Sequence, residues 1–420
     1  MAFQLISVSS FSRSIRAGDS KRFSVNLKKH RKEILEDVTR EALTAPPILA
    51  PYAKTKIRGK ACVSYQRYND NLVIRAISDH LRRRLRVSTI DRNASIEGIV
   101  QGLSDGTPMH VLRRDIKDFY ETIDVAAFRD RLLFDPLVTP RVRAYLKHFF
   151  DQHCPPGTIG LPRGIGLSAL LAELHMQEFD RKVRNIEGVY RYYRFADDIF
   201  IFSDLPPADI APLLAASLPT GMAFNAEKSV DRSLTSAETK TVEFLGYQFR
   251  IIPPRKEGAG RTICVTMSPR KIARLKSRVI VSVKAFSRTG EFSLLYDRLK
   301  YLTSNYEVRR NGQRTIASST HVRSGIYYNY RYCGTYSVNK AGMIEHTEWD
   351  GRDLRALDGF MNSLIYGDGS ALRTKVAPKL IPDHRAALRK LSFYHGYHSR
   401  ILARIQPHRI GEIKSVWRNV

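Results

Sequence analysis

The chain has 420 residues, and its 69 lysines and arginines against 41 aspartates and glutamates give a formal net charge of +28. A hydrophobic fraction of 43% beside 26% charged residues excludes a disordered chain. So large a positive charge favours an extended polyanion as partner, with a solvated basic surface as the alternative.

Membrane and redox signals are both weak. No apolar run is long enough to span a bilayer, and no basic amphipathic or lipidation signal stands out. The four cysteines lie far apart and lack zinc spacing, so we expect neither a zinc module nor a disulfide framework. We therefore expect a cytoplasmic protein that does not bind membranes.

Residues 1–50 are predicted to form a flexible basic arm followed by a helix. The start is rich in serine and arginine and has no acid before Asp19. The segment from Val25 to Leu49 has a helical composition, which Pro46 and Pro47 end.

Two basic segments follow. Lys54, Lys56, Arg58 and Lys60 surround Gly59 in a predicted β-hairpin, where cations could hold a triphosphate or form only a basic surface. Residues 70–86 predict an amphipathic helix, whose arginine-rich end at residues 82–86 is a candidate for contact with a phosphate backbone.

Residues 111–123 predict a strand that ends in Asp115 and turns into a helix. Asp118 and Glu121 would then be acids in the first helical turn, which the helix dipole favours. Residues 161–176 predict a turn with Arg163 and Gly164, followed by a helix with leucines at helical spacing. A glycine-rich turn at a helix start lets the backbone approach a nucleotide closely.

Residues 189–203 predict two strands joined by a short turn at Asp197 and Asp198. Two adjacent carboxylates between buried strands repel each other and usually need a cation. An ordinary turn that contains aspartate is the alternative.

The rest of the chain changes character near Pro253 and Pro254. Before them come a helix at 206–218, a segment with Asn225 and Lys228, and a strand pair around Gly246. After them the pattern is mainly helical, with a basic C-terminal helix from residue 383 onward.

These anchors resemble, in order and spacing, motifs A to E of reverse transcriptases over residues 50–250. They are the strand with Asp115, the Pro-x-Gly-x-x-x-Ser helix, the FADD hairpin, the Asn-x-x-Lys segment and the FLGY strand. They look most like those of bacterial retron-type, abortive-infection and other phage-defence-associated members. The resemblance implies an α+β fold, with right-hand polymerase fingers and palm at 51–252 and a mainly helical, thumb-like or helical-array domain at 253–420.

Nucleotidyl transfer of this kind uses two Mg²⁺ ions bound by oxygen ligands. The resemblance implies that Asp115, the carbonyl of Ile116 and Asp197 bind the ions, and that Asp198 supports the second metal position or the primer end. Lys228 resembles the general acid that protonates pyrophosphate, with a surface lysine as the alternative.

Other roles also follow from the resemblance. Tyr120 matches the bulky gate that favours dNTPs, or else is a core tyrosine. The dNTP-binding set adds Lys56, Arg58, Arg163 and Gly164. The primer grip is expected at Phe244, Leu245, Gly246 and Tyr247.

Two positions depart from the family pattern: Arg163 stands where glutamine is usual, and Ala169 where proline is usual. Some defence-associated members synthesise DNA without a conventional template or start on a protein hydroxyl. Tyr327, Tyr328 and Tyr330 could therefore stack on single-stranded bases or prime synthesis, or could belong to a strand packed on the helical domain.

The function that we expect is an RNA-directed DNA polymerase in bacterial antiviral defence. Template-independent or protein-primed synthesis and a nucleic-acid-binding scaffold with an inactive palm are alternatives; a nucleotide cyclase is disfavoured because its Gly-Gly-acidic hairpin is missing. Expected partners are RNA, DNA and dNTPs, with a noncoding RNA, a second copy of the chain or another protein as further candidates.

Overall fold

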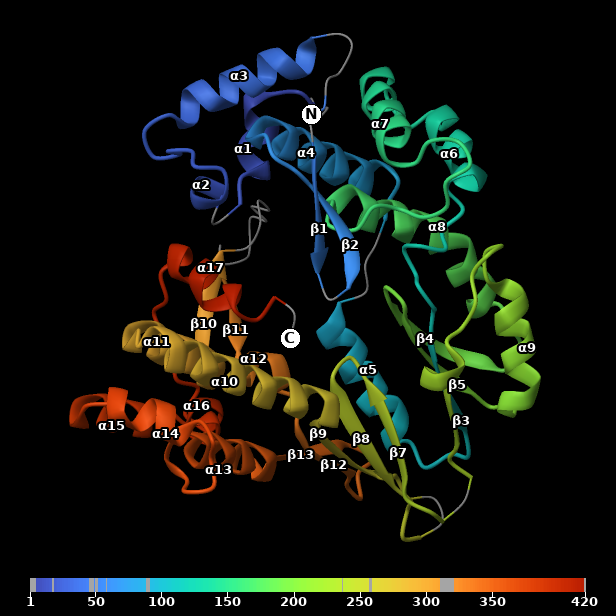
Figure 1. The fold of residues 1–420 in the computed structure, drawn as a ribbon. Helices are drawn as coiled ribbons and strands as arrows, with labels where there is room; N and C mark the ends of the chain where they lie inside the picture. The colour runs from blue at the N-terminus through green and yellow to red at the C-terminus, as the bar shows by residue number, and fades with distance from the viewer. Residues whose placement is uncertain are drawn as a thin grey trace. The chain divides into compact units, whose positions relative to one another are not determined.

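The computed structural model describes residues 5–16, 19–44, 49, 52–57, 59–87, 91–235, 237–256, 259–309 and 321–418. These residues form two compact units of a mixed α/β fold (Figure 1). Unit 1 holds the described residues up to Gly102 and those of Gly106–Leu245, and unit 2 holds Leu103–Asp105 and the described residues from Gly246 onward. The boundary expected after residue 252 stays a prediction, and the division into the two compact units falls between Leu245 and Gly246.

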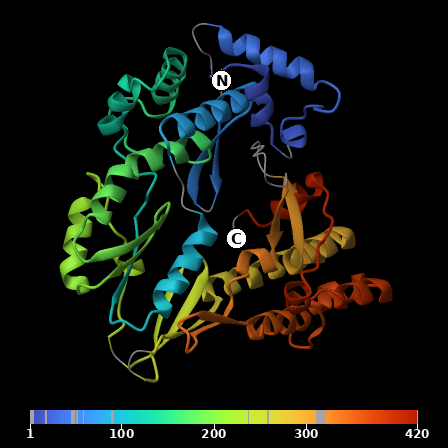
Figure 2. The ribbon, with the colours of Figure 1, turned by 180° about the vertical axis from the view of Figure 1, so that it is seen from behind.

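The N-terminal segment is helical and packed. Helices α1 (Val8–Ser14), α2 (Asp19–Arg22) and α3 (Arg31–Leu43) precede α4 (Tyr68–Arg84), and α1, α3 and α4 lie side by side (Figures 1 and 2). Phe11 is 1% exposed, and Asp19 forms a buried ion pair with Arg75 at 2.7 Å. The expectation of a flexible basic arm is therefore wrong for the described residues, because an apolar anchor and a buried ion pair fix them.

The predicted basic hairpin is confirmed as β1 (Tyr52–Ile57) and β2 (Lys60–Tyr65), which pair antiparallel. The amphipathic helix after it is confirmed as α4, whose apolar side is fully buried at Leu72 and Leu81.

The central sheet of unit 1 has the strand order β4-β5-β3-β6, and each neighbouring pair is antiparallel. The strands are β3 (His110–Asp115), β4 (Val189–Phe195), β5 (Asp198–Ser203) and β6 (Val230–Ser233). Residues 199–202 of the inner strand β5 are all 0% exposed. The hairpin expected at 189–203 is confirmed.

Helices cover both faces of this sheet. Tyr193 of β4 packs against Gly98 of α5 (Arg92–Ser104), where a Cβ would meet its ring. Tyr192 points to the other face, since side chains alternate along a strand, and packs on Phe179 of α8 (Gly166–Arg184). Helix α9 (Pro207–Ser217) packs against α8, so the helices expected from 161 and at 206–218 are both confirmed.

The segment after β3 differs from expectation. Residues 117–122 form turns, with Asp118 at φ 47°, and the next helices are α6 (Val125–Phe134) and α7 (Pro140–His153). Asp118 and Glu121 are therefore not acids of a first helical turn. Their side chains instead pair with cations from elsewhere in unit 1.

Unit 2 combines a sheet with helices. Strands β8 (Tyr247–Ile252), β9 (Thr262–Met267), β12 (Gly334–Val338) and β13 (Ile344–Glu348) lie in the order β13-β12-β9-β8. Helix α10 (Pro269–Thr289) packs against α11 (Phe292–Thr303) and α13 (Arg352–Tyr366). The expected helices of this region are confirmed, but strands accompany them.

The remaining elements of unit 2 are short. They are the hairpin β10 (Asn305–Arg309) and β11 (His321–Gly325), then α12 (Ile326–Tyr330), α14 (Arg373–Val376), η2 (Ala377–Lys379), α15 (Pro382–Arg389), α16 (Phe393–His398) and α17 (Pro407–Ser415). The basic region from 383 is thus three helices rather than one. No helix in the described part of the chain has the length and apolar character needed to cross a membrane.

Candidate active site

Three acids share one end of the central sheet. Asp115, the last residue of β3, lies opposite Asp198, the first residue of β5. The backbone N–H of Ile116 donates a hydrogen bond to the carbonyl of Asp197 at 3.0 Å. The strand pairing therefore brings together two acids that lie far apart in the sequence.

Asp197 lies in the tight turn between β4 and β5, where Phe195 pairs with Asp198. Ala196 has a φ of 55°, a conformation that is unfavourable for residues other than glycine. Arg194 donates a hydrogen bond to the carbonyl of Ala196 at 3.1 Å. The turn is therefore supported from the side of β4.

Arg194 is itself anchored to α8. Its guanidinium donates two hydrogen bonds to Asp180, at 2.6 and 2.7 Å, and one to Glu173 at 2.8 Å. Its side chain is only 4% exposed. Burial lowers the pKa of Arg194, but the contacts with Asp180 and Glu173 outweigh this effect and raise it. This buried ion cluster connects the acidic turn to the helix behind it.

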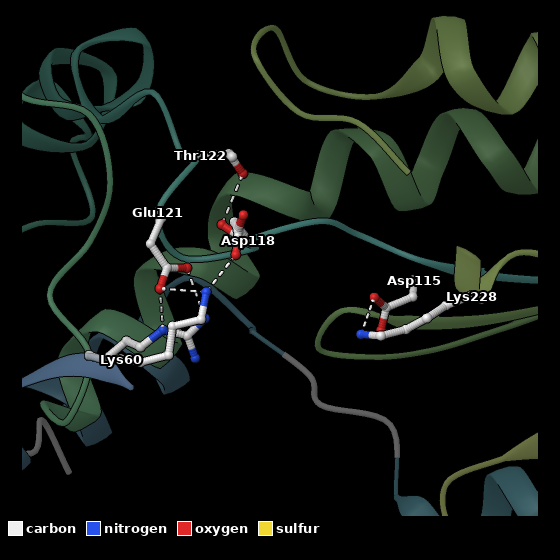
Figure 3. A network of polar contacts seen from close by, with 7 residues as sticks. Lys60, Asp115, Asp118, Glu121, Thr122 and Lys228 are labelled. Atoms are coloured by element: carbon white, nitrogen blue, oxygen red, sulfur yellow. Dashed lines mark hydrogen bonds and ion pairs between the residues drawn. The ribbon is translucent and has the colours of Figure 1, made fainter. Parts of the chain in front are cut away.

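The electrostatics of the strand end call for cations. Burial raises the pKa of Asp197, and the neighbouring charges of Asp198 and Asp115 raise it further. Lys228 donates a hydrogen bond to Asp115 at 2.7 Å (Figure 3). Arg113 donates one to Asp198 at 3.2 Å. Two of the three carboxylates thus face a cation of the protein itself.

Lys228 is placed by the segment that the sequence singled out. The η1 turn (Ala226–Lys228) follows Asn225, whose side chain accepts a hydrogen bond from the N–H of Glu227 at 3.2 Å. The N–H of Asn225 donates to the carbonyl of Asp115 at 2.7 Å. Asn225 therefore fixes the lysine beside the acid.

The donor set suits magnesium in its chemistry. Carboxylate oxygens and a backbone carbonyl are the ligands that Mg²⁺ prefers, and the three acids and Ile116 supply them at one strand end. In the described residues, no three histidine, cysteine, aspartate or glutamate side chains form a ready metal cluster. The acids are suitable magnesium ligands by chemical type and by their position at one strand end. In this structure Lys228 contacts Asp115 and Arg113 contacts Asp198.

A second polar network lies between the hairpin and the turns after β3. Lys60 of β2 contacts Asp118 and lies 3.5 Å from Glu121 (Figure 3). Arg163 donates two hydrogen bonds to Glu121, at 2.7 and 2.8 Å, and its guanidinium lies 4.9 Å from the ring centre of Tyr120. Three of the members, Tyr120, Arg163 and Lys60, come from separate parts of the sequence.

The remaining expected nucleotide-binding residues differ in placement. Lys56 is exposed on β1, and Arg58 lies outside the described residues. Gly164 has a φ of +97°, and a Cβ there would lie 2.5 Å from the carbonyl oxygen of Val63. Gly164 therefore lets its loop pack on β2, which is a structural reason for glycine at this position.

The expected primer-grip residues straddle the boundary between the units. Within unit 1, Phe244 of β7 (Lys240–Phe244) packs against Phe200 with a ring separation of 5.2 Å, and the carbonyl of Leu245 accepts a hydrogen bond from Arg92 at 2.8 Å. Within unit 2, Gly246 has a φ of +86°, and the buried Tyr247 donates to the carbonyl of Asn329 at 2.9 Å. The side chains of Phe244 and Tyr247 are thus buried, each in the core of its own unit.

The three tyrosines weighed for stacking or priming lie on α12 and not on a strand. Tyr327 packs against Tyr397 with a ring separation of 5.3 Å and lies under the guanidinium of Arg400 at 4.4 Å. The hydroxyl of Tyr328 accepts a hydrogen bond from Arg323 at 3.2 Å, and the ring of Tyr330 lies 5.9 Å from that of Tyr247.

Enzymes that transfer nucleotidyl groups commonly use acids that converge on two metal ions. Residues 54–249 match the family model of the reverse transcriptase (RNA-dependent DNA polymerase). The chain thus carries a reverse transcriptase domain from β1 into β8, and this domain indicates a nucleotidyltransferase of the RNA-directed DNA polymerase type. No curated protein was found to match the chain.

Proposed function

We propose that the chain copies RNA into DNA with two Mg²⁺ ions held by Asp115, Asp197 and Asp198, and that it acts in bacterial antiviral defence. The observation that carries the catalytic part is the pairing of Asp115 with Asp198 inside the matched domain. The defence part rests on the resemblance of the motifs to retron-type, abortive-infection and other phage-defence enzymes.

Each acid has a distinct role in the proposal. Asp115 and Asp197 bind the ions together with the carbonyl of Ile116, and Asp198 supports the second ion or the primer end. Bound Mg²⁺ would stabilise negative charge on the attacking and leaving oxygens. The raised pKa of Asp197 supports this role, because a buried acid beside two others favours a nearby cation.

Lys228 is proposed to donate a proton to the leaving pyrophosphate. Its ammonium group lies 2.7 Å from Asp115, so a proton donor stands beside the carboxylate that binds metal. General acid catalysis requires a donor within hydrogen-bond reach of the reacting group, and Lys228 would meet this requirement if the pyrophosphate is held at the ions beside Asp115.

The incoming dNTP is proposed to lie over the network of Lys60, Arg163 and Tyr120. Lys56 of β1 is proposed as a further contact, as is Arg58, which lies outside the described residues. Arginine and lysine are suited to triphosphate oxygens. Both Lys60 and Arg163 contact Glu121, so a triphosphate would compete with this carboxylate for them. The ring of Tyr120 would select against a ribose 2′-hydroxyl, and the turn at Leu245 and Gly246 would support the primer.

There are two alternatives, of which the first uses the same catalytic domain and the second lacks catalytic activity. Template-independent or protein-primed synthesis would use a hydroxyl such as those of Tyr327, Tyr328 and Tyr330. An inactive nucleic-acid-binding scaffold is disfavoured, because a scaffold has no need for three acids at one strand end. Expected partners are RNA, DNA and dNTPs, with a noncoding RNA, another copy or another protein as candidates.

The decisive experiment is incorporation of labelled dNTPs on a primed RNA template by the double variant Asp197→Ala/Asp198→Ala. We expect no incorporation and an unchanged circular dichroism spectrum. Asp204→Ala, an exposed acid just past the other end of β5, is the matched control and should stay active. Undiminished synthesis by the double variant would exclude the assigned catalytic centre.

The alternatives are separated by the product. Synthesis that resists RNase treatment of the template and co-purifying RNA indicates template-independent synthesis. Product that stays with the denatured protein until protease digestion indicates protein priming.

A further inference from the structure

Unit 1 contains a cavity whose lining includes none of the catalytic, metal-binding or dNTP-binding residues. It has a volume of about 910 Å³ and lies where the C-terminal parts of α4, α6 and α8 meet. Its lining has exposed cations, which form the rim, and buried apolar side chains, which form the floor, besides Gln177 and two acids. The cations are Arg83, Arg84, Arg86, Arg131 and Arg181.

The cavity carries an excess of positive charge. Among the described residues that line it, five are arginines and two, Asp135 and Glu178, are acids. Asp135 accepts a hydrogen bond from the N–H of Leu137 at 2.8 Å, and Glu178 pairs with Lys182 at 3.3 Å. The excess is about three charges, whereas the ends of three helices would supply only about −0.5 each. An anion is therefore favoured here.

The arginines of different helices act on the same space. The pKa of Glu178 is lowered first by Lys182, but also by Arg181 of α8 and Arg131 of α6. In α4, Arg84 and Arg83 lower the pKa of His80, after the larger effect of its burial. A ligand in the cavity would meet cations from all three helices.

Arg86 gives an independent indication of function. It follows the end of α4 with a φ of 49°, and the N–H of Val87 donates to the carbonyl of Arg82 at 2.9 Å, closing the helix. Glycine is the usual residue at such a left-handed position, because it adopts this conformation without strain. Strained residues of this kind cluster at functional sites. The need to complement a helix dipole would not explain an arginine in this conformation.

The floor of the cavity is apolar. Phe128, Leu132 and Leu174 are 4%, 6% and 9% exposed. A nucleotide unit matches such a site, because its base packs on apolar or aromatic groups and its phosphate accepts two hydrogen bonds from a guanidinium.

We propose that this arginine cavity binds a segment of single-stranded RNA, with phosphates on the arginine rim and a base on the apolar floor. RNA is preferred over other strands because the chain carries a reverse transcriptase domain, and in this respect the proposal rests on the proposed function. The cavity would hold part of the RNA away from the catalytic acids. It would thereby increase the time that the template or a noncoding RNA stays bound.

The test is binding of an unstructured single-stranded RNA to Arg131→Ala/Arg181→Ala, measured by fluorescence anisotropy over a range of salt. If both side chains contact phosphates, the slope of log affinity against log salt becomes shallower by about 1.4, and affinity at low salt falls several-fold. Lys28→Ala/Lys29→Ala removes the same charge from exposed sites in unit 1 and should change the slope far less. An unchanged slope in the arginine variant overturns the proposal.

Arg86→Gly separates a binding role from a structural one. It removes the backbone strain, so the melting temperature should rise while RNA affinity falls. A rise in stability with unchanged RNA affinity would contradict the proposal. A structural role for Arg86 would instead lower both quantities.

Two further measurements distinguish RNA binding in the cavity from catalysis at the acids and from binding of a free nucleotide. Asp197→Ala/Asp198→Ala should keep the full salt slope, so failure of the catalytic assignment and failure of the arginine cavity give different results. Titration with ATP tests for a free nucleotide as the ligand. ATP affinity that depends on Arg131 and Arg181, with RNA affinity unchanged, would replace RNA by a free nucleotide and overturn the proposal.

Discussion

Replacement of Arg194 by methionine tests how the acidic turn is held. Arg194 is 4% exposed at its side chain, and it neutralises Asp180 and Glu173, which are 15% and 16% exposed. Methionine keeps most of the length and removes the charge, so two largely buried carboxylates lose their cationic partner, while Asp180 keeps the hydrogen bond from the hydroxyl of Tyr192 at 2.6 Å. Removing one partner of a buried ion pair destabilises a protein by about 3–5 kcal/mol.

The expected loss can be measured by thermal unfolding. For a unit of this size, about 3–5 kcal/mol corresponds to a decrease of about 6–20 °C in melting temperature. Arg191→Met is the matched control on the same strand, because Arg191 is exposed and makes one hydrogen bond, to Gly98 at 3.3 Å. This control should shift the melting temperature by no more than a few degrees.

A second variant tests whether the loss comes from unpaired charge. Asp180→Asn combined with Arg194→Met removes one acid together with its partner, so the double variant should lose less than the sum of the two single losses. Additive losses, or a loss for Arg194→Met no larger than for Arg191→Met, would refute the reasoning. The polymerase activity of Arg194→Met should also fall, because the turn that carries Asp197 loses its support.

Three other predictions concern separate features of unit 1. Lys60→Ala should raise the KM for dNTPs several-fold with little change in kcat, while Lys56→Ala has a smaller effect; equal effects in steady-state kinetics would contradict the role of Lys60. Gly164→Ala should destabilise the fold by more than about 1 kcal/mol, because its Cβ would lie 2.5 Å from a backbone oxygen. Gly157 also has a positive φ, of +83°, but has open space around it, so Gly157→Ala measures the effect of backbone strain alone. Burial lowers the pKa of His153 to about 4 from its ordinary value of 6.5, so its stabilising effect is complete above pH 6.5 and is lost as the pH falls toward 4. The melting temperature should therefore decrease over this range more steeply than that of His153→Gln, and parallel curves would argue against this assignment.

Local patterns predicted much of unit 1. The hairpin with Asp197 was predictable because aromatic and β-branched residues flank a short acidic step, and α8 because its leucines repeat at helical spacing. Both signals lie within about twenty residues of sequence. The order of the motifs then placed Asp115 near this hairpin, and the strand register agrees.

Contacts between distant residues could not be predicted in the same way. The contact of Lys60 with Asp118 spans 58 positions and that of Arg163 with Glu121 spans 42, so no periodicity connects them. The turns at 117–122 contain acids that also suit a helix start, and local composition does not separate the two. The N-terminal helix α1 was missed because its single buried apolar residue, Phe11, lies among serines and arginines.

In unit 2, some helices are too short to be predicted from the sequence. Helices α12 and α16 have 5 and 6 residues, too few for a helical period to be recognised. The tyrosine-rich segment alternates as a strand would, but its aromatic side chains pack on a helix in the tertiary structure. Neighbours that are remote in sequence decide such segments.

The contact between Lys228 and Asp115 bears on how the protein responds to its ionic surroundings. An ammonium group already balances this carboxylate, so the sheet end should reach its native form when divalent ions are scarce. Chelators would then switch off synthesis while leaving the polypeptide folded and able to restart once magnesium returns. The activity of the enzyme would depend reversibly on the magnesium concentration, whereas its folded structure would not depend on it.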